Sequence, residues 1–301
     1  MFEYLLILGF CLAVHECGHF CFAKAFGVLV YSFQVFMAPI AALLRYYPKQ
    51  GCLCILDVEA TPDKDSETDA DDDEGDAVAD NVSASTEQRS SCLIRIPLPR
   101  PKGEVSPTSW RNTAFGLGWL PVMAYVRMAD SYGVDGHEPL PWELRSKPAW
   151  QRLLVHSGGV MANILFGLLA FVVANYIWMY NSDPTYLLAA VGGGLTQCWD
   201  ALSFFLAHPL AIFGVGGGFE AAPLIVCKMH GIVYFTGLLS IILAVGNALP
   251  IPGLDGSRML LNLAEIVTRR APSERLRRNI DIVGGLLVFL WIVYLVISWI
   301  A

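Results

Sequence analysis

The sequence has little charge. Of its 301 residues only 16% are charged, 55% are hydrophobic, and the mean hydropathy is +0.50. Soluble domains carry about 25% charged residues, so this composition excludes a soluble protein of ordinary type. It does not imply a nucleic-acid partner either, because the net charge is −7 and the excess of acidic residues is confined to one segment.

The eight cysteines lack the spacing of a zinc or disulfide framework. One residue separates Cys52 from Cys54, whereas the cysteines of a zinc knuckle usually have two residues between them. Most of the others fall in apolar runs or on the predicted cytoplasmic side, where thiols stay reduced. We therefore expect no structural disulfide.

The chain also lacks internal repeats, heptads and a signal-peptide cleavage site. Its first apolar run starts Met-Phe-Glu without a basic flank, so we expect this run to be retained as a helix. No segment has the length and pattern of a second domain. Residues 1–301 are therefore predicted to form one membrane domain.

Four apolar runs are long enough to cross a bilayer, which takes about 20 residues. They cover residues 1–26, 153–180, 231–249 and 280–300. A weaker run at 201–215 is interrupted by His208-Pro209 and is predicted to be interfacial or re-entrant. The fold class expected is an α-helical polytopic membrane protein with four transmembrane helices.

Basic residues predict the orientation of these helices. Lys and Arg gather between the first and second runs and again after the third, while only Lys228 lies between the second and third. By the positive-inside rule, the two basic loops are cytoplasmic and both termini lie on the non-cytoplasmic side.

The first cytoplasmic loop combines strand-like pieces with an acidic insertion. Residues 28–36, 93–99 and 119–128 have strand character, which predicts a small membrane-associated β-sheet after the first helix. Between them, Asp57–Glu87 carries thirteen acidic residues and a single lysine. Residues 57–91 are therefore predicted to be a disordered acidic insertion, because they cannot bury enough apolar surface to order.

Chemistry-bearing residues interrupt the first apolar run. On a helix, His15 and His19 lie four positions apart and point from one face, where both can bind one metal ion. Glu16 lies on the next edge, placed to take a proton from a metal-bound water. A charged residue at mid-membrane costs roughly 2.5 to 3.5 kcal/mol on insertion scales, so these residues indicate a functional site.

A catalytic zinc site usually has three protein ligands and one open position. The best third candidate is Asp255, in a stretch where two prolines and two glycines break the third apolar run. Alone, Asp255 would suit a helix N-cap; with the histidine pair, the ligand interpretation is favoured. Asn163, within the second run, is either an interhelical hydrogen-bonding residue or a substrate contact. The remaining histidines, His137, His156, His208 and His230, have no comparable partners.

Three motifs in this order resemble the site-2 protease family, and within it the bacterial branch that regulates the sigma-E factor. They are His15 to His19 on the first run, Gly159 to Asn163 on the second, and Asn247 to Asp255 on the third. The resemblance covers nearly all of the chain outside the acidic insertion.

This resemblance implies an intramembrane zinc endopeptidase that cuts single-pass membrane proteins, such as anti-sigma factors or signal-peptide remnants, in the bacterial cytoplasmic (inner) membrane. It implies one Zn²⁺ held by His15, His19 and Asp255, with Glu16 as base. Asn163 and Asn247 match positions that steady the substrate or the site. The sheet would bind an unwound substrate by strand addition.

The sequence departs from that family in the segment 175–230, which is too short for the PDZ domains of its nearest branch. Substrate selection would then rest on the membrane domain or on an adaptor. Two alternatives remain from the residues alone, a membrane metal-ion transporter and a non-catalytic membrane-protein binder. The transporter lacks an inverted repeat, and the binder would not need Glu16.

Overall fold

The computed structural model describes residues 2–38, 41–58, 91–99, 106–129, 139–179, 186–209, 228–273, 275–280, 282–287 and 290. Three of its helices are long and apolar enough to cross a membrane, at Glu3–Ala25, Ala149–Ile177 and Gly231–Ala248. They confirm three of the four predicted spans. The fourth, at 280–300, lies largely outside the described residues, although 282–287 are helical.

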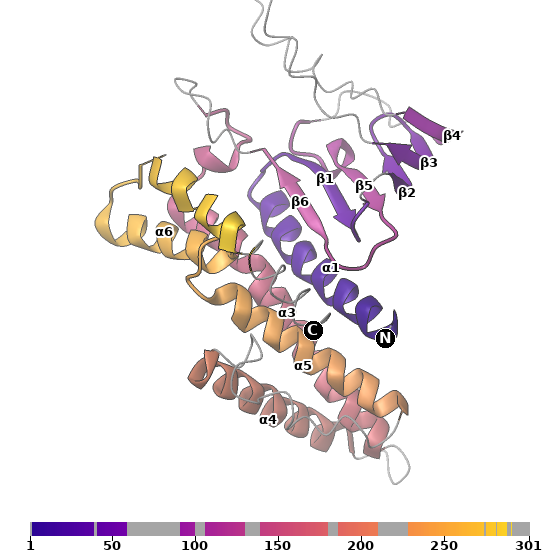
Figure 1. The fold of residues 1–301 in the computed structure, drawn as a ribbon, viewed down its shortest axis with the longest axis vertical. Coiled ribbons are helices and arrows are strands. Elements are labelled where there is room, and N and C mark those ends of the chain that lie inside the picture. The colour runs from indigo at the N-terminus through magenta and orange to yellow at the C-terminus, as the bar shows by residue number, and fades with distance from the viewer. Residues whose placement is uncertain are drawn as a thin grey trace, which may run out of the picture.

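The helical part is a bundle around α3. Its helices are α1 (Phe2–Ala25), α3 (Ala149–Met179), α4 (Tyr186–Ala207), α5 (Lys228–Ala248) and α6 (Asp255–Thr268). Figure 1 shows α1, α3 and α5 running side by side, with the sheet next to α1. Phe171, Cys198, Phe205 and Ile241 form the apolar core where α3, α4 and α5 meet.

Glycines allow the closest helix contacts. A Cβ on Gly18 of α1 would lie 2.1 Å from the carbonyl oxygen of Gly158 on α3. Such small residues let two backbones approach without intervening side chains. Gly18 lies between His15 and His19 in the sequence, so this contact brings the histidine-bearing part of α1 against α3.

The sheet between α1 and α3 has six strands in the order β4-β3-β2-β5-β1-β6. Their bounds are β1 Val30–Val35, β2 Ala42–Tyr47, β3 Cys52–Val58, β4 Ser91–Pro97, β5 Ala114–Leu117 and β6 Tyr125–Met128. The strand pieces predicted at 28–36, 93–99 and 119–128 correspond to β1, β4 and β6, so a sheet after the first helix is confirmed. Strands β2, β3 and β5 were not predicted.

The ends of the segment predicted as a disordered acidic insertion, residues 57–91, are strand residues, because Asp57 and Val58 belong to β3 and Ser91 belongs to β4. Val58 and Ser91 are partners in the antiparallel pairing of β3 with β4, and the residues between them lie outside the described part of the chain. The insertion therefore leaves and re-enters the fold at one point of the sheet, at the strand pair farthest from β6.

The loops that follow β1 and β5 pack against the N-terminal half of α1. A Cβ on Gly9 would lie 2.7 Å from the Phe36 ring and 2.8 Å from Pro121. Gly9 precedes the histidine motif by more than one turn, so the loops after β1 and β5 reach past the candidate site along α1. Trp119 and Met123 of this region are exposed, as expected of side chains that face lipid.

Helix α4 was missed by the sequence analysis. The segment 175–230 was predicted to contain only a short interfacial run at 201–215, yet Tyr186–Ala207 is one helix packed on α3 and α5. Gly192 to Gly194 lie within this helix, and Gly194 is a contact point, where a Cβ would lie 2.5 Å from the Val172 side chain.

Candidate metal site

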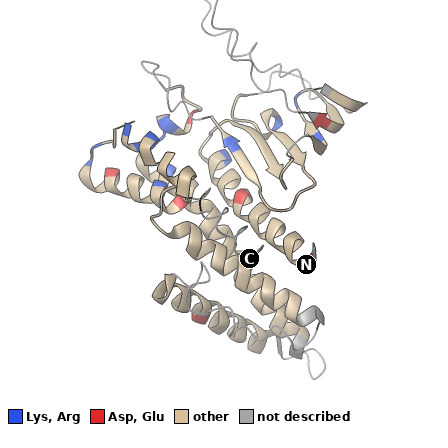
Figure 2. Cartoon of the chain, viewed as in Figure 1, with Lys and Arg blue, Asp and Glu red and all other residues tan. Residues whose placement is uncertain are grey.

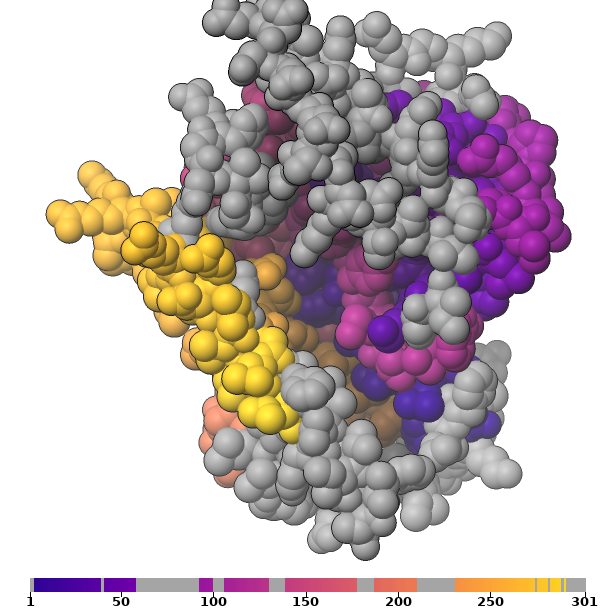
Figure 3. All heavy atoms as spheres, turned by 45° about the horizontal axis from the view of Figure 1, so that its top comes forward, coloured from indigo at the N-terminus to yellow at the C-terminus, as the bar shows by residue number. Residues whose placement is uncertain are grey.

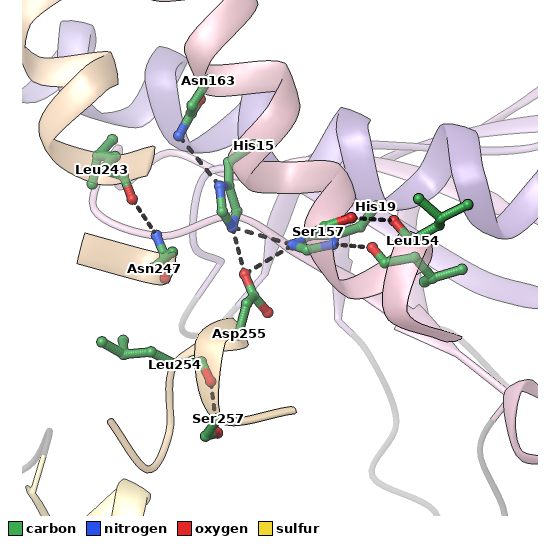
Figure 4. Close-up of polar contacts among 11 residues, drawn as sticks. His15, His19, Leu154, Ser157, Asn163, Leu243, Asn247, Leu254, Asp255 and Ser257 are labelled. Carbon is green, nitrogen blue, oxygen red and sulfur yellow. Dashed lines mark hydrogen bonds and ion pairs between the residues drawn. The ribbon is translucent and has the colours of Figure 1, made fainter. Parts of the chain in front are cut away.

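Three side chains from two distant parts of the chain converge at the centre of the bundle (Figure 4). The Nε2 atom of His15 lies 2.9 Å from Oδ2 of Asp255, and Nε2 of His19 lies 3.1 Å from the same oxygen. The two Nε2 atoms are 3.1 Å apart. Among the described residues, these three form the group of histidine, cysteine and acidic side chains able to hold one metal ion.

The triangle of ligand atoms fits zinc. Zinc bonds to nitrogen and oxygen of about 2.0 to 2.1 Å, arranged tetrahedrally, place neighbouring ligand atoms about 3.3 Å apart. The observed separations of 2.9 to 3.1 Å are close to that value. Both histidines are buried, whereas 19% of the Asp255 side chain is exposed. The site is therefore partly accessible through Asp255.

Helix α3 shapes the space for the ion. A Cβ on Gly159 would lie 2.5 Å from the Nε2 atoms of both His15 and His19. Any larger side chain at this position would fill the space in front of the two ligand atoms. The glycine therefore leaves room in front of the two ligand atoms.

The second nitrogen of each histidine is also engaged. Nδ1 of His19 donates to the carbonyl oxygen of Val155 at 2.7 Å, which leaves the Nε2 lone pair available for a metal. Nδ1 of His15 lies 3.2 Å from the amide nitrogen of Asn163. Asn163 is fully buried and its Oδ1 has no partner.

The orphaned oxygen of Asn163 supports metal binding at His15. A metal on Nε2 of His15 requires the ring proton on Nδ1, which then needs an acceptor. Rotating the Asn163 amide by half a turn puts Oδ1 in that position. Asn163 is thus placed to orient His15, because its Oδ1 has no other partner in the described residues.

Asp255 reaches the site through a turn. Pro250 and Pro252 follow the end of α5, and Gly253 has φ of +90°, a conformation that favours glycine. The N-cap of α6 is Leu254, so Asp255 is the first helical residue and not the cap. Burial would raise the pKa of Asp255, but its hydrogen bonds with His15 and His19 outweigh burial and hold that pKa below its usual range.

Glu16 lies between the histidines and the sheet. Its carboxylate faces the backbone N–H of Val126 in β6 and is close to His15, His19 and Asp255. Strand β6 lies at one end of the described sheet, so the candidate base sits next to an edge strand. Figure 3 shows a hollow in this face of the molecule, with α1 (indigo) on its floor between the C-terminal segment (yellow) and the strand region (magenta).

Asn247 is near the site but does not join it. Its Nδ2 atom donates to the carbonyl oxygen of Leu243 in its own helix at 3.0 Å. Figure 4 shows no contact between Asn247 and the histidines or Asp255. The structure thus brings His15, Glu16, His19, Asp255 and Asn163 together and leaves Asn247 half-buried beside them.

Parts of this chain are similar to known proteins. The sequence profile of peptidase family M50 matches residues 3–50 and 104–291, which leaves out the acidic insertion. Several bacterial proteins named "Putative zinc metalloprotease" are similar. The one from Lactococcus lactis is 34% identical over 94 residues, covering 31% of this chain and 20% of that protein.

Two further relatives carry the same name. The protein of Staphylococcus aureus strain COL is 27% identical over 138 residues, covering 45% of this chain and 28% of that protein. The protein of Chlamydia pneumoniae is 47% identical over 68 residues, covering 22% of this chain and 10% of that protein. These alignments span less than a third of each relative's length, whereas the family profile matches most of this chain, which therefore belongs to peptidase family M50.

Proposed function

We propose that this protein is an intramembrane zinc endopeptidase that hydrolyses a peptide bond in the transmembrane segment of single-pass membrane proteins. The observation that carries the proposal is the convergence of His15, His19 and Asp255 within 3.1 Å of one another on membrane helices and their turn. Family membership and the adjacent Glu16 support it.

His15, His19 and Asp255 would hold the ion through Nε2, Nε2 and Oδ2. A zinc ion bound there supplies Lewis acidity, which polarises a carbonyl and lowers the pKa of bound water. Glu16 takes the proton of the attacking water and returns it to the leaving amine. Asn163 keeps His15 in the tautomer that binds through Nε2.

The sheet supports a mode of substrate binding. A transmembrane helix must unwind before cleavage, and its freed backbone groups need partners in the membrane. Strand β6 is an edge strand beside Glu16. We propose that the unwound substrate pairs with β6, which satisfies its backbone and brings one peptide bond to Glu16.

The charge distribution supports a cytoplasmic location for the cut. Figure 2 shows Lys and Arg gathered at the end of the molecule where α3 begins and α6 ends. Helix α4, at the opposite end, contains no Lys or Arg. By the positive-inside rule, the site lies in the cytoplasmic half of the membrane. Anti-sigma factors and signal-peptide remnants are the proposed substrate classes, and an adaptor is the proposed means of selection.

Glu16→Gln tests the proposal. Purified protein in nanodiscs should keep one zinc per chain but lose cleavage of a model transmembrane substrate by at least a hundredfold, because the amide cannot accept the proton. Glu3→Gln on the same helix is the control, since Glu3 is exposed. Retained cleavage in the Glu16 variant would contradict the assignment of Glu16 as the base of the peptidase.

A further inference from the structure

Helix α6 has its polar and apolar faces reversed relative to a helix of a soluble protein. Leu260, Leu263 and Val267 are exposed, with 75% of Val267 accessible. Its packed residues include Gly256, Ser257 and Asn262. In a membrane this arrangement is favourable, because the apolar face contacts lipid and the polar face turns toward the protein. Of the polar side chains of α6, Glu265 bonds to α3 through Arg152.

Glu265, near the end of α6, forms salt bridges with two arginines. Its Oε1 accepts from Arg152 of α3 at 2.5 Å, and its Oε2 accepts from Arg277 at 3.0 Å. All three side chains are mostly buried, with exposed fractions of 16%, 7% and 13%. Charge-assisted bonds to both carboxylate oxygens fix the orientation of this side chain.

Arg152 is itself anchored to the start of α3. Its Nε donates to the carbonyl oxygen of Lys147 at 3.0 Å, so its guanidinium is held at both ends. Farther along α3, Val155 accepts from His19, Gly159 faces both histidines and Asn163 contacts His15. Residues 152, 155, 159 and 163 recur at helical spacing, so the same face of α3 contacts both the histidines of α1 and Glu265 of α6.

Glu265 and Asp255 share one uninterrupted helix. They are ten positions apart, about 15 Å along the axis, so holding one end of the helix constrains the other. At the Asp255 end, Leu254 provides no side-chain cap. We propose that Glu265, held by Arg152 and Arg277, is a positioning residue for the third metal ligand. Through α6 it sets the distance between Asp255 and the histidine pair.

This inference rests on the proposed metal site, but it can fail independently of the proposed activity. The alternative is that the three charges simply stabilise the cytoplasmic end of the bundle. The two roles differ in the effect of loosening α6. A positioning role predicts a change at the metal, whereas a stabilising role predicts a change only in the unfolding temperature.

The test compares Glu265→Gln with Arg270→Gln. Arg270 is an exposed arginine just beyond the same helix, so its replacement controls for the loss of one charge in this region. Zinc affinity is measured by competition with a chelator, and the absorption spectrum of the Co²⁺-loaded protein reports ligand geometry. We expect Glu265→Gln to weaken zinc binding about 10-fold, the lower range for residues that orient metal ligands, and Arg270→Gln to leave it unchanged.

Hydrogen exchange of the metal-free protein gives a second readout. Amides of residues 249–258 should exchange several-fold faster in Glu265→Gln than in the wild type or Arg270→Gln.

Two results would overturn the inference. One is zinc affinity within twofold of the wild type in Glu265→Gln, whatever happens to the unfolding temperature. The other is unchanged hydrogen exchange of the amides of residues 249–258, which would show that Asp255 is held in place without the salt bridges of Glu265. Neither result would contradict the proposed activity, which is tested separately by Glu16→Gln.

Discussion

The histidine side and the aspartate side of the candidate site are held in different ways. His15 and His19 come from one 24-residue helix that contacts α3 through Gly18 and Gly158. Each histidine has a polar partner on α3 within 3.2 Å. Asp255 follows a proline-glycine turn and starts a 14-residue helix, whose charged anchor lies ten residues away.

This difference shows where the site is rigid and where it is adjustable. The histidine pair is set by helical spacing and by direct contacts, so its geometry depends on nearby atoms. The position of Asp255 depends on a turn and on contacts with the C-terminal segment. We therefore expect substitutions on the histidine side to have the larger effects.

Gly159→Ala should have the largest effect. Its Cβ would occupy space 2.5 Å from both Nε2 atoms, so zinc binding should be lost at micromolar metal while the helical circular dichroism is retained. Gly192→Ala on α4 is the matched control, because nothing lies within 4 Å of the added Cβ. One zinc per chain in Gly159→Ala would show that the histidines hold no ion at these positions.

Asn163→Leu should weaken zinc binding by roughly 10- to 100-fold, the range found for residues that orient metal-bound histidines. The leucine cannot accept the Nδ1 proton of His15. Asn163→Asp retains an acceptor and should stay within about threefold of the wild type. The opposite order of these two affinities would contradict the assigned role of Oδ1.

On the aspartate side, Gly284→Ala tests the turn. Its Cβ would lie 2.1 Å from the backbone nitrogen of Gly253, whereas a Cβ on Gly285 meets nothing within 4 Å. We expect Gly284→Ala to weaken zinc binding about fivefold, less than Asn163→Leu, because the turn shifts to accommodate one methyl group. Gly285→Ala should match the wild type. Equal affinities in the two variants would mean that this contact does not position Asp255.

Asn247→Ala should have the smallest effect on the metal. Its only described hydrogen bond is to Leu243 in its own helix, so zinc affinity should stay within about twofold. If Asn247 contacts the substrate, the variant raises KM for the model substrate without loss of zinc. A tenfold loss of zinc affinity would place Asn247 among the residues that support the site.

Some of this structure was accessible from local sequence. Hydropathy located three of the spans because each is a continuous apolar run long enough to cross a membrane, and helical spacing placed His15, Glu16 and His19 together. Strands β1, β4 and β6 carried enough aliphatic and aromatic residues to be recognised. The missed elements had misleading local signals: α4 contains three consecutive glycines, and β3 contains the Cys52 and Cys54 pair.

The sequence by itself determined the membrane class, the histidine motif and the candidate for the third ligand, since these depend on composition, spacing and recognisable motifs. Only the tertiary structure decided what surrounds them. Three contacts join residues 113 to 144 positions apart: the approach of Gly159 to the histidines, the hydrogen bond from His19 to the Val155 carbonyl, and the salt bridge between Arg152 and Glu265. Such contacts are set by how α1, α3 and α6 pack, because packing brings together side chains that no local pattern relates.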